Sequence, residues 1–160
     1  MKTVGIVLLI AACTCAGWVR ARRLSRRVEE LEAFRGFLSA VGTEIRFAAL
    51  PVEMLVRRHR SLSPWLAACD EKLSAGEPFP LAWQEAVALC PVPDGDKAFF
   101  REFGEGLGTS DVEGQMAHCR LCETRLEELL AAARDDKLKK SKLYLTLGIC
   151  AGLAAGLVLL

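Results

Sequence analysis

Histidine is scarce in this chain, and the sequence patterns of the common enzyme classes are missing. Only two histidines, His59 and His118, occur, and they lie far apart in the sequence. There is no glycine-rich loop followed by Lys and Ser or Thr, no HExxH motif and no Ser/His/Asp spacing. Gly104, Gly106 and Gly108 alternate, but they follow a predicted helix and not a strand, which argues against a dinucleotide-binding loop. We therefore expect no enzymatic activity and no cofactor.

Acidic residues are absent from both ends of the chain. All 20 Asp and Glu lie between Glu29 and Asp136, where 11 Lys and Arg leave a formal charge of −9. Binding to nucleic acid needs a basic face. The acidic middle segment therefore argues against nucleic acid as a partner.

Two uncharged apolar runs, 3–19 and 143–160, have basic residues clustered on the side that faces the middle of the chain. At about 1.5 Å per residue each run reaches roughly 25–27 Å, the low end of what spans a hydrocarbon core of about 30 Å. Cytoplasmic flanks of membrane spans collect Lys and Arg. The sequence thus predicts two transmembrane helices, with both termini outside and residues 20–142 forming a cytoplasmic domain. The basic flanks, which we expect to contact anionic membrane lipids, are Arg20, Arg22, Arg23, Arg26, Arg27, Lys137, Lys139, Lys140 and Lys142.

The first run has two alternative interpretations. Its short length also fits a cleaved signal peptide, and Ile10–Cys13 resembles the cleavage box of a bacterial lipoprotein. Both alternatives require the next segment to cross the membrane, which the five arginines oppose. A retained anchor is therefore the favoured interpretation.

The middle segment has helical periodicity and no strand-like alternation of useful length. Apolar residues recur at helical spacing from Leu24 to Ala48 and from Val112 to Ala133. Prolines and capping residues, among them Ser63 and Asp94, predict four shorter helices between them, at about 51–60, 64–74, 80–90 and 96–105. We predict an all-α fold in which a six-helix cytoplasmic bundle is tethered by an N-terminal and a C-terminal transmembrane helix.

The sharpest break in the middle segment is the turn from Gly106 to Asp111. Glycine ends one helix, and Ser110 is predicted to cap the next, with Glu113 completing a capping box. Such a turn, exposed and locally rigid, either contacts a partner or serves only as a corner between helices. The residues predicted for a partner contact are Gly108, Thr109, Ser110, Asp111, Gln115 and His118, of which the last two could brace the turn from inside.

Seven cysteines are present, but their odd number and their places do not fit a disulfide framework. Cys119 and Cys122 form a CxxC pair beside His118, yet no second pair completes the four ligands of a zinc site. Both cysteines lie on the apolar stripe of their helix, so core packing is the favoured interpretation. A membrane-tethered thiol or metal protein that uses Cys119 and Cys122 stays as the alternative. His59 lies in a run of arginines and is expected on a solvated face.

Four segments of the chain resemble the stage III sporulation protein AB family of endospore-forming bacteria. The most specific is the Leu107–Asp111 turn with Gln115 and His118 behind it. The cysteines are not part of the family pattern. The other three segments are Thr43–Phe47 followed by Leu50–Pro51, Trp83 with Glu85 and Ala86, and the basic stretch ahead of Leu143–Gly148.

The resemblance implies a place in a channel complex that forms between mother cell and forespore. The expected partners are the stage III sporulation ATPase of the protein AA family and the other subunits of that complex. The helical domain is similar to the cytoplasmic domains of platform proteins in type II secretion and type IV pilus systems. The resemblance therefore implies a non-enzymatic platform on the mother-cell side that couples the ATPase to the membrane channel. A general secretion or pilus platform is the alternative, although such proteins usually carry two copies of this domain and more spans.

Overall fold

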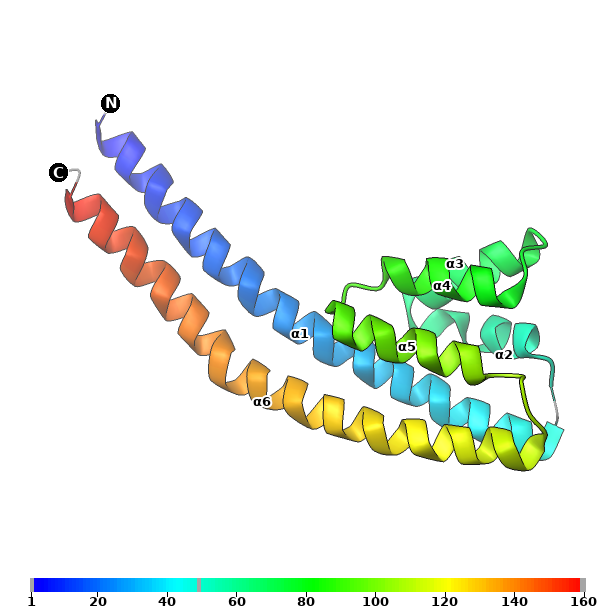
Figure 1. The fold of residues 1–160 in the computed structure, drawn as a ribbon. Coiled ribbons are helices and arrows are strands. Elements are labelled where there is room, and N and C mark those ends of the chain that lie inside the picture. Colours follow the sequence, from blue (N-terminus) through cyan, green and yellow to red (C-terminus); the bar gives the residue numbers. More distant parts are fainter. Residues whose placement is uncertain (1, 49, 159–160) are drawn as a thin grey trace. The chain divides into compact units, whose positions relative to one another are not determined.

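The computed structural model describes the backbone of residues 2–48 and 50–158; the side chains of 2–10, 48, 145, 152–153 and 155–158 are not described. Over these residues the chain is helical and contains no strand, which confirms the predicted all-α class (Figure 1). The elements are α1 (Lys2–Ala48), α2 (Val52–His59), the 3-10 helix η1 (Arg60–Leu62), α3 (Pro64–Ser74), α4 (Phe79–Leu89), α5 (Asp94–Gly106) and α6 (Val112–Val158).

The chain forms two compact units, and each contains a part of α1 and a part of α6. Unit 1 consists of Met1–Val28 and Ala131–Leu160, and unit 2 consists of Glu29–Leu130. The two ends of the chain therefore belong to the same unit, and the four short helices belong to the other.

In unit 1 the two helix segments run antiparallel and lie in close contact. A Cβ atom on Gly17 would lie 2.6 Å from the carbonyl oxygen of Tyr144, and one on Gly148 would lie 2.9 Å from the carbonyl oxygen of Cys13. Farther along, the guanidinium of Arg27 forms an ion pair with Asp136 at 3.5 Å. Small residues allow the backbones of two helices to approach this closely.

The predicted membrane spans are not confirmed. Among the described residues, no helix contains a stretch that is both long enough and apolar enough to cross a membrane. The predicted spans, 3–19 and 143–160, include segments whose side chains lie outside the described part of the chain.

The core of unit 2 is built from aromatic rings. The Phe34 ring on α1 stacks on Phe100 of α5 with centroids 4.1 Å apart, and the indole N–H of Trp83 donates to the carbonyl oxygen of Phe100 at 2.8 Å. Helix α3 packs on α2, η1 and α4, and α4 packs on α5. These contacts bring the short helices onto α1. The buried rings are Phe34, Phe37, Trp65, Trp83, Phe99, Phe100 and Phe103.

The apolar stripes predicted for the two long helices are largely buried in their respective units. Val112 is exposed at the first turn of α6, Leu24 and Met116 are half-buried, and the side chain of Ala48 lies outside the described residues. The stripe residues found buried are Val28, Leu31, Phe34, Leu38, Val41 and Ile45 on α1, and Cys119, Cys122, Leu126, Leu130 and Ala133 on α6.

Two predicted helix caps are wrong. Ser63 precedes α3 as expected, but its hydroxyl makes no capping bond and donates to Glu30 Oε2 at 2.6 Å. The same oxygen accepts the indole N–H of Trp65 at 3.2 Å, so Glu30 joins α1 to the start of α3. Asp94 lies in the first turn of α5, which starts earlier than predicted because Pro93 already supplies the N-terminal boundary.

His59 is not on a solvated face. Its Nε2–H donates to Glu44 Oε1 at 3.1 Å, its ring lies edge-on to Phe37, and Arg58 binds the same carboxylate oxygen at 3.2 Å. The half-buried imidazole and the Arg58 guanidinium thus bind the same oxygen of Glu44 and link α2 to α1.

The neighbouring arginines also hold a carboxylate. Asp70 on α3 is buried, and its two oxygens bind Arg57 and Arg60, each at 3.2 Å. The basic run at the end of α2 is therefore part of the tertiary structure of unit 2.

Candidate functional site

The turn between α5 and α6 has a backbone that requires glycine. Helix α5 ends at Gly106, and the next residue, Leu107, is buried. Gly108 has φ +81°, a left-handed conformation that L side chains rarely adopt. A Cβ there would also lie 3.3 Å from Cγ2 of Val52 on α2. The chain therefore reverses over a corner with a fixed shape.

Asp111, and not Ser110, caps α6. Asp111 Oδ1 accepts the backbone N–H of Gly114 at 3.0 Å, which satisfies a free donor of the first helical turn. Ser110 lies one residue too early, and its hydroxyl oxygen accepts a hydrogen bond from Gln115 Nε2 at 3.2 Å instead. The predicted capping box of Ser110 and Glu113 is thus wrong.

Gln115 braces the turn from the first turns of α6. Its amide nitrogen donates to the carbonyl oxygen of Gly106 at 3.1 Å as well as to Ser110. Thr109 Oγ1 donates to the same carbonyl oxygen at 2.9 Å. The end of α5 is thereby bonded both to the turn and to the start of α6.

His118 fills the space beside Gly106. Its ring stacks on Phe103 with centroids 5.6 Å apart, and its Nε2–H donates to the carbonyl oxygen of Phe103 at 3.1 Å. A Cβ on Gly106 would clash with this ring. The position of the His118 ring therefore requires a residue without a side chain at Gly106.

The six predicted contact residues fall into two groups. Gly108, Thr109, Ser110 and Asp111 are exposed. Gln115 is only 5% exposed, and His118 is half-buried. The exposed group is available to a partner, whereas Gln115 acts by holding that group in place.

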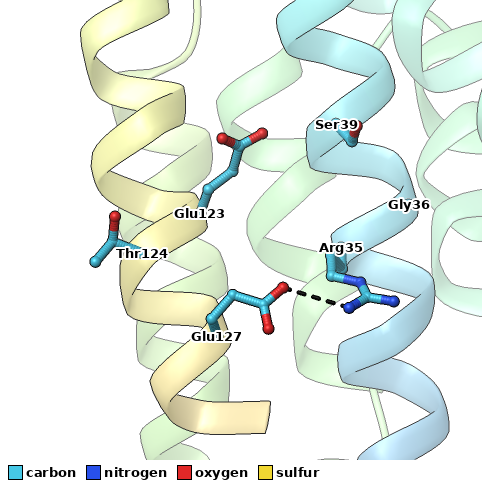
Figure 2. A pocket seen from close by; sticks show the side chains of 6 residues that line it. All are labelled: Arg35, Gly36, Ser39, Glu123, Thr124 and Glu127. Atoms are coloured by element: carbon cyan, nitrogen blue, oxygen red, sulfur yellow. Dashed lines mark hydrogen bonds and ion pairs between the residues drawn. The ribbon is translucent and has the colours of Figure 1, made fainter. Parts of the chain in front are cut away.

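A groove along α1 and α6 in unit 2 was not indicated by the sequence. One part, of about 550 Å³, is lined by Arg35, Gly36 and Ser39 of α1 and by Glu123, Thr124 and Glu127 of α6. In Figure 2 the Glu127 side chain extends from α6 toward Arg35 of α1, with which it pairs at 3.3 Å. This part of the groove is open to solvent and contains charged side chains, unlike the enclosed pockets of small-molecule sites.

A second part of the groove adjoins the turn. It has a volume of about 730 Å³ and is lined by Arg46, Val112, Glu113, Met116 and Arg120. Val112 and Glu113 open α6 directly after Asp111. The exposed turn is thus continuous with a hollow that contains both charged and apolar side chains.

The CxxC pair lies in the core, as the favoured interpretation predicted. Cys119 and Cys122 are both buried, and burial raises the pKa of each thiol to about 11. Thiols are nucleophiles and metal ligands only as thiolates. Among the residues that the structure describes, no three His, Cys, Asp or Glu side chains gather as a metal site would require.

Comparison with known proteins gives one family. The model of the family described as Stage III sporulation protein AB (spore_III_AB) matches residues 2–160. Stage III sporulation protein AB of Bacillus subtilis (strain 168) is 25% identical over 170 aligned residues, which cover 100% of this chain and 99% of the relative. No solved structure matches the chain.

Proposed function

Because this chain belongs to the stage III sporulation protein AB family, we propose that it is a platform subunit of the channel complex between mother cell and forespore. In this role it catalyses no reaction and couples a cytoplasmic ATPase of the stage III sporulation protein AA family to the membrane channel. The observation that carries the proposal is the family match over residues 2–160, which includes both long helices and the whole of unit 2.

The proposal places the chain in the mother-cell membrane. The runs at 3–19 and 143–160 cross the membrane, both termini lie outside, and the middle segment is cytoplasmic. This topology is supported by the clusters of basic residues, which flank each apolar run on its inner side. Two anchors on one helical domain would fix its orientation to the membrane, as a coupling element requires.

The contact with the ATPase is proposed at the turn from Gly108 to Asp111. Four exposed residues follow one another there on a backbone that Gln115 and Thr109 hold by hydrogen bonds. A contact surface that is already ordered loses less conformational entropy on binding. The formal charge of −9 between Glu29 and Asp136 supports an encounter steered by charge.

A binding titration between the purified full-length protein and the purified ATPase tests the coupling role. Asp111→Lys is expected to weaken binding about tenfold, because it reverses a charge in the contact. It also removes the cap of α6, which costs about 1 kcal/mol of stability, so the unfolding free energy must be measured on the same sample.

Two variants separate contact from folding. Asp111→Asn keeps a side-chain oxygen for the Gly114 N–H but removes the charge, so it should weaken binding without a comparable loss of stability. Glu71→Lys makes the same charge change at an exposed position on α3 and should leave the affinity close to wild type. If no complex forms at low salt, even with the protein in membranes, the coupling role is wrong.

A further inference from the structure

The structure brings the two basic flanks of the chain together in unit 1. Gly17 lies against Tyr144, and Arg27 pairs with Asp136. The segment 20–27 of α1 therefore lies alongside the segment 136–144 of α6. Residues more than a hundred positions apart in sequence form one surface, which we call the basic collar. It comprises Arg20, Arg22, Arg23, Arg26, Arg27, Lys137, Lys139, Lys140 and Lys142.

The basic collar is far from neutral. Its nine cations face only two acidic residues, Asp135 and Asp136, in the segments 20–27 and 135–142. Asp135 binds Lys139 at 2.7 Å, and Asp136 binds Lys140 at 2.5 Å as well as Arg27. The formal net charge of the collar with these two aspartates is therefore +7. Most of the nine Lys and Arg side chains are exposed.

Two aromatic rings position guanidinium groups at the edge of the collar. The Arg22 guanidinium lies over the Trp18 ring at 4.5 Å from the centroid, and that of Arg20 lies over Tyr144 at 5.9 Å. Trp and Tyr favour the headgroup region of a bilayer. Guanidinium groups bind phosphate through paired hydrogen bonds. Cations and rings thus occur together where an apolar run ends.

We propose that the basic collar is a binding site for anionic phospholipid headgroups, with Arg20 and Arg22 directed toward the phosphates by Tyr144 and Trp18. The charge complementarity and the adjoining apolar runs favour a lipid over an acidic protein surface. The inference rests on the membrane anchoring proposed above and not on the ATPase contact. Its failure and the failure of the coupling role are therefore distinguishable.

Tryptophan fluorescence of the full chain in vesicles tests the proposal. The vesicles contain phosphatidylcholine and, at equal mole fraction, either brominated phosphatidylglycerol or brominated phosphatidylcholine, with the bromine close to the headgroup. Bromine quenches only on contact. Trp18 is 50% exposed, whereas Trp65 and Trp83 are 2% and 1% exposed in the core of unit 2. Quenching therefore reports on lipid at the collar, and Trp18→Phe should abolish it.

The wild-type protein is expected to prefer brominated phosphatidylglycerol at least about fivefold, the effect of one cation that contacts an anionic surface. The preference should shrink toward equality at high salt, and in the variant that combines Arg22→Gln, Arg23→Gln and Lys142→Gln. A control with Arg35→Gln, Arg120→Gln and Arg125→Gln removes the same charge from unit 2 and should keep the preference.

Several results would overturn the proposal. Equal quenching by both lipids in the wild-type protein would show that the collar does not select anionic headgroups, and salt-sensitive self-association in its place would identify an acidic protein surface as the occupant. A preference that survives in the triple variant would assign it to other residues. No quenching by either lipid would show that Trp18 does not meet the bilayer.

Discussion

Cys119 and Cys122 illustrate how burial decides the chemistry of a residue. The CxxC spacing alone fits a redox or metal site as well as a helix core. In unit 2 the Cys119 side chain packs beside Gly42, whose added Cβ would lie 3.9 Å from that of Cys119. Burial raises the pKa of both thiols to about 11. At neutral pH both groups stay protonated and act as small apolar side chains.

The buried thiols should make the protein less stable at alkaline pH. An unfolded thiol ionises near pH 8.5, so above this pH the unfolded state loses protons that the folded state keeps, and the free energy of unfolding falls as pH rises. The loss should reach about 2 kcal/mol per thiol at pH 10, and Cys119→Ala with Cys122→Ala should reduce it. Denaturant titrations of the full chain in detergent at about pH 8 and about pH 10 measure the difference.

The same double variant tests the thiol hypothesis. It should bind the ATPase with the wild-type affinity, because neither sulfur reaches the contact turn. Loss of binding with unchanged helicity and stability would assign a functional role to the thiols.

Other residues show where sequence reasoning stops. The run Arg57–Arg60 is visible as a basic stretch, but its partners Glu44 and Asp70 come from α1 and α3. Their meeting depends on how α1, α2 and α3 pack, which no local spacing encodes. Burial of the Cys119 and Cys122 side chains was predictable, because apolar periodicity encodes which face of a helix turns inward.

At the scale of elements, prolines fixed the helix boundaries better than capping residues did. Helix α3 begins at Pro64 as predicted, and α4 begins at Phe79, within one residue of the prediction. Proline acts through its own fixed φ, so its effect is local. Capping depends on which of several neighbouring oxygens reaches a free N–H. At the start of α6, Ser110 and Asp111 were both candidates, and the backbone reversal at Gly108 brings Asp111 into position.

Two alanine variants distinguish the observed cap of α6, Asp111, from the cap predicted from the sequence, Ser110. Asp111→Ala should lower the free energy of unfolding by about 0.5–2 kcal/mol, because the Gly114 N–H loses its acceptor. Ser110→Ala should lower the free energy of unfolding by less. The Gln115 amide loses its hydrogen bond to Ser110 in this variant but still donates to the carbonyl oxygen of Gly106. Thermal and denaturant unfolding of the two variants under identical conditions measures the order. A larger loss for Ser110→Ala would restore the predicted capping box.

At the scale of the whole molecule, the two ends of the chain come together while the middle forms its own core. Helices α1 and α6 each run through both units. No break in the helical pattern marks Val28 or Leu130, so the division follows from which contacts each segment makes. The aromatic core, which sets unit 2 apart, was only partly visible in the sequence, because the spacing of the rings on α5 does not reveal that they meet Phe34 of α1.

The last prediction concerns the topology of the whole chain. In the proposed arrangement the turn between α3 and α4 lies in the cytoplasm and the N-terminus lies outside. Ala75 is exposed in that turn, so Ala75→Cys, in a background with Cys13→Ala, Cys15→Ala and Cys150→Ala, offers a reactive thiol while the buried cysteines stay protected. In intact cells it should react with a membrane-permeant maleimide and resist an impermeant one, and cell lysis should abolish the difference. Lys2→Cys is the matched control and should react with both reagents. Labelling of Ala75→Cys by the impermeant reagent in intact cells would reverse the topology and remove the basis for a cytoplasmic contact with the ATPase.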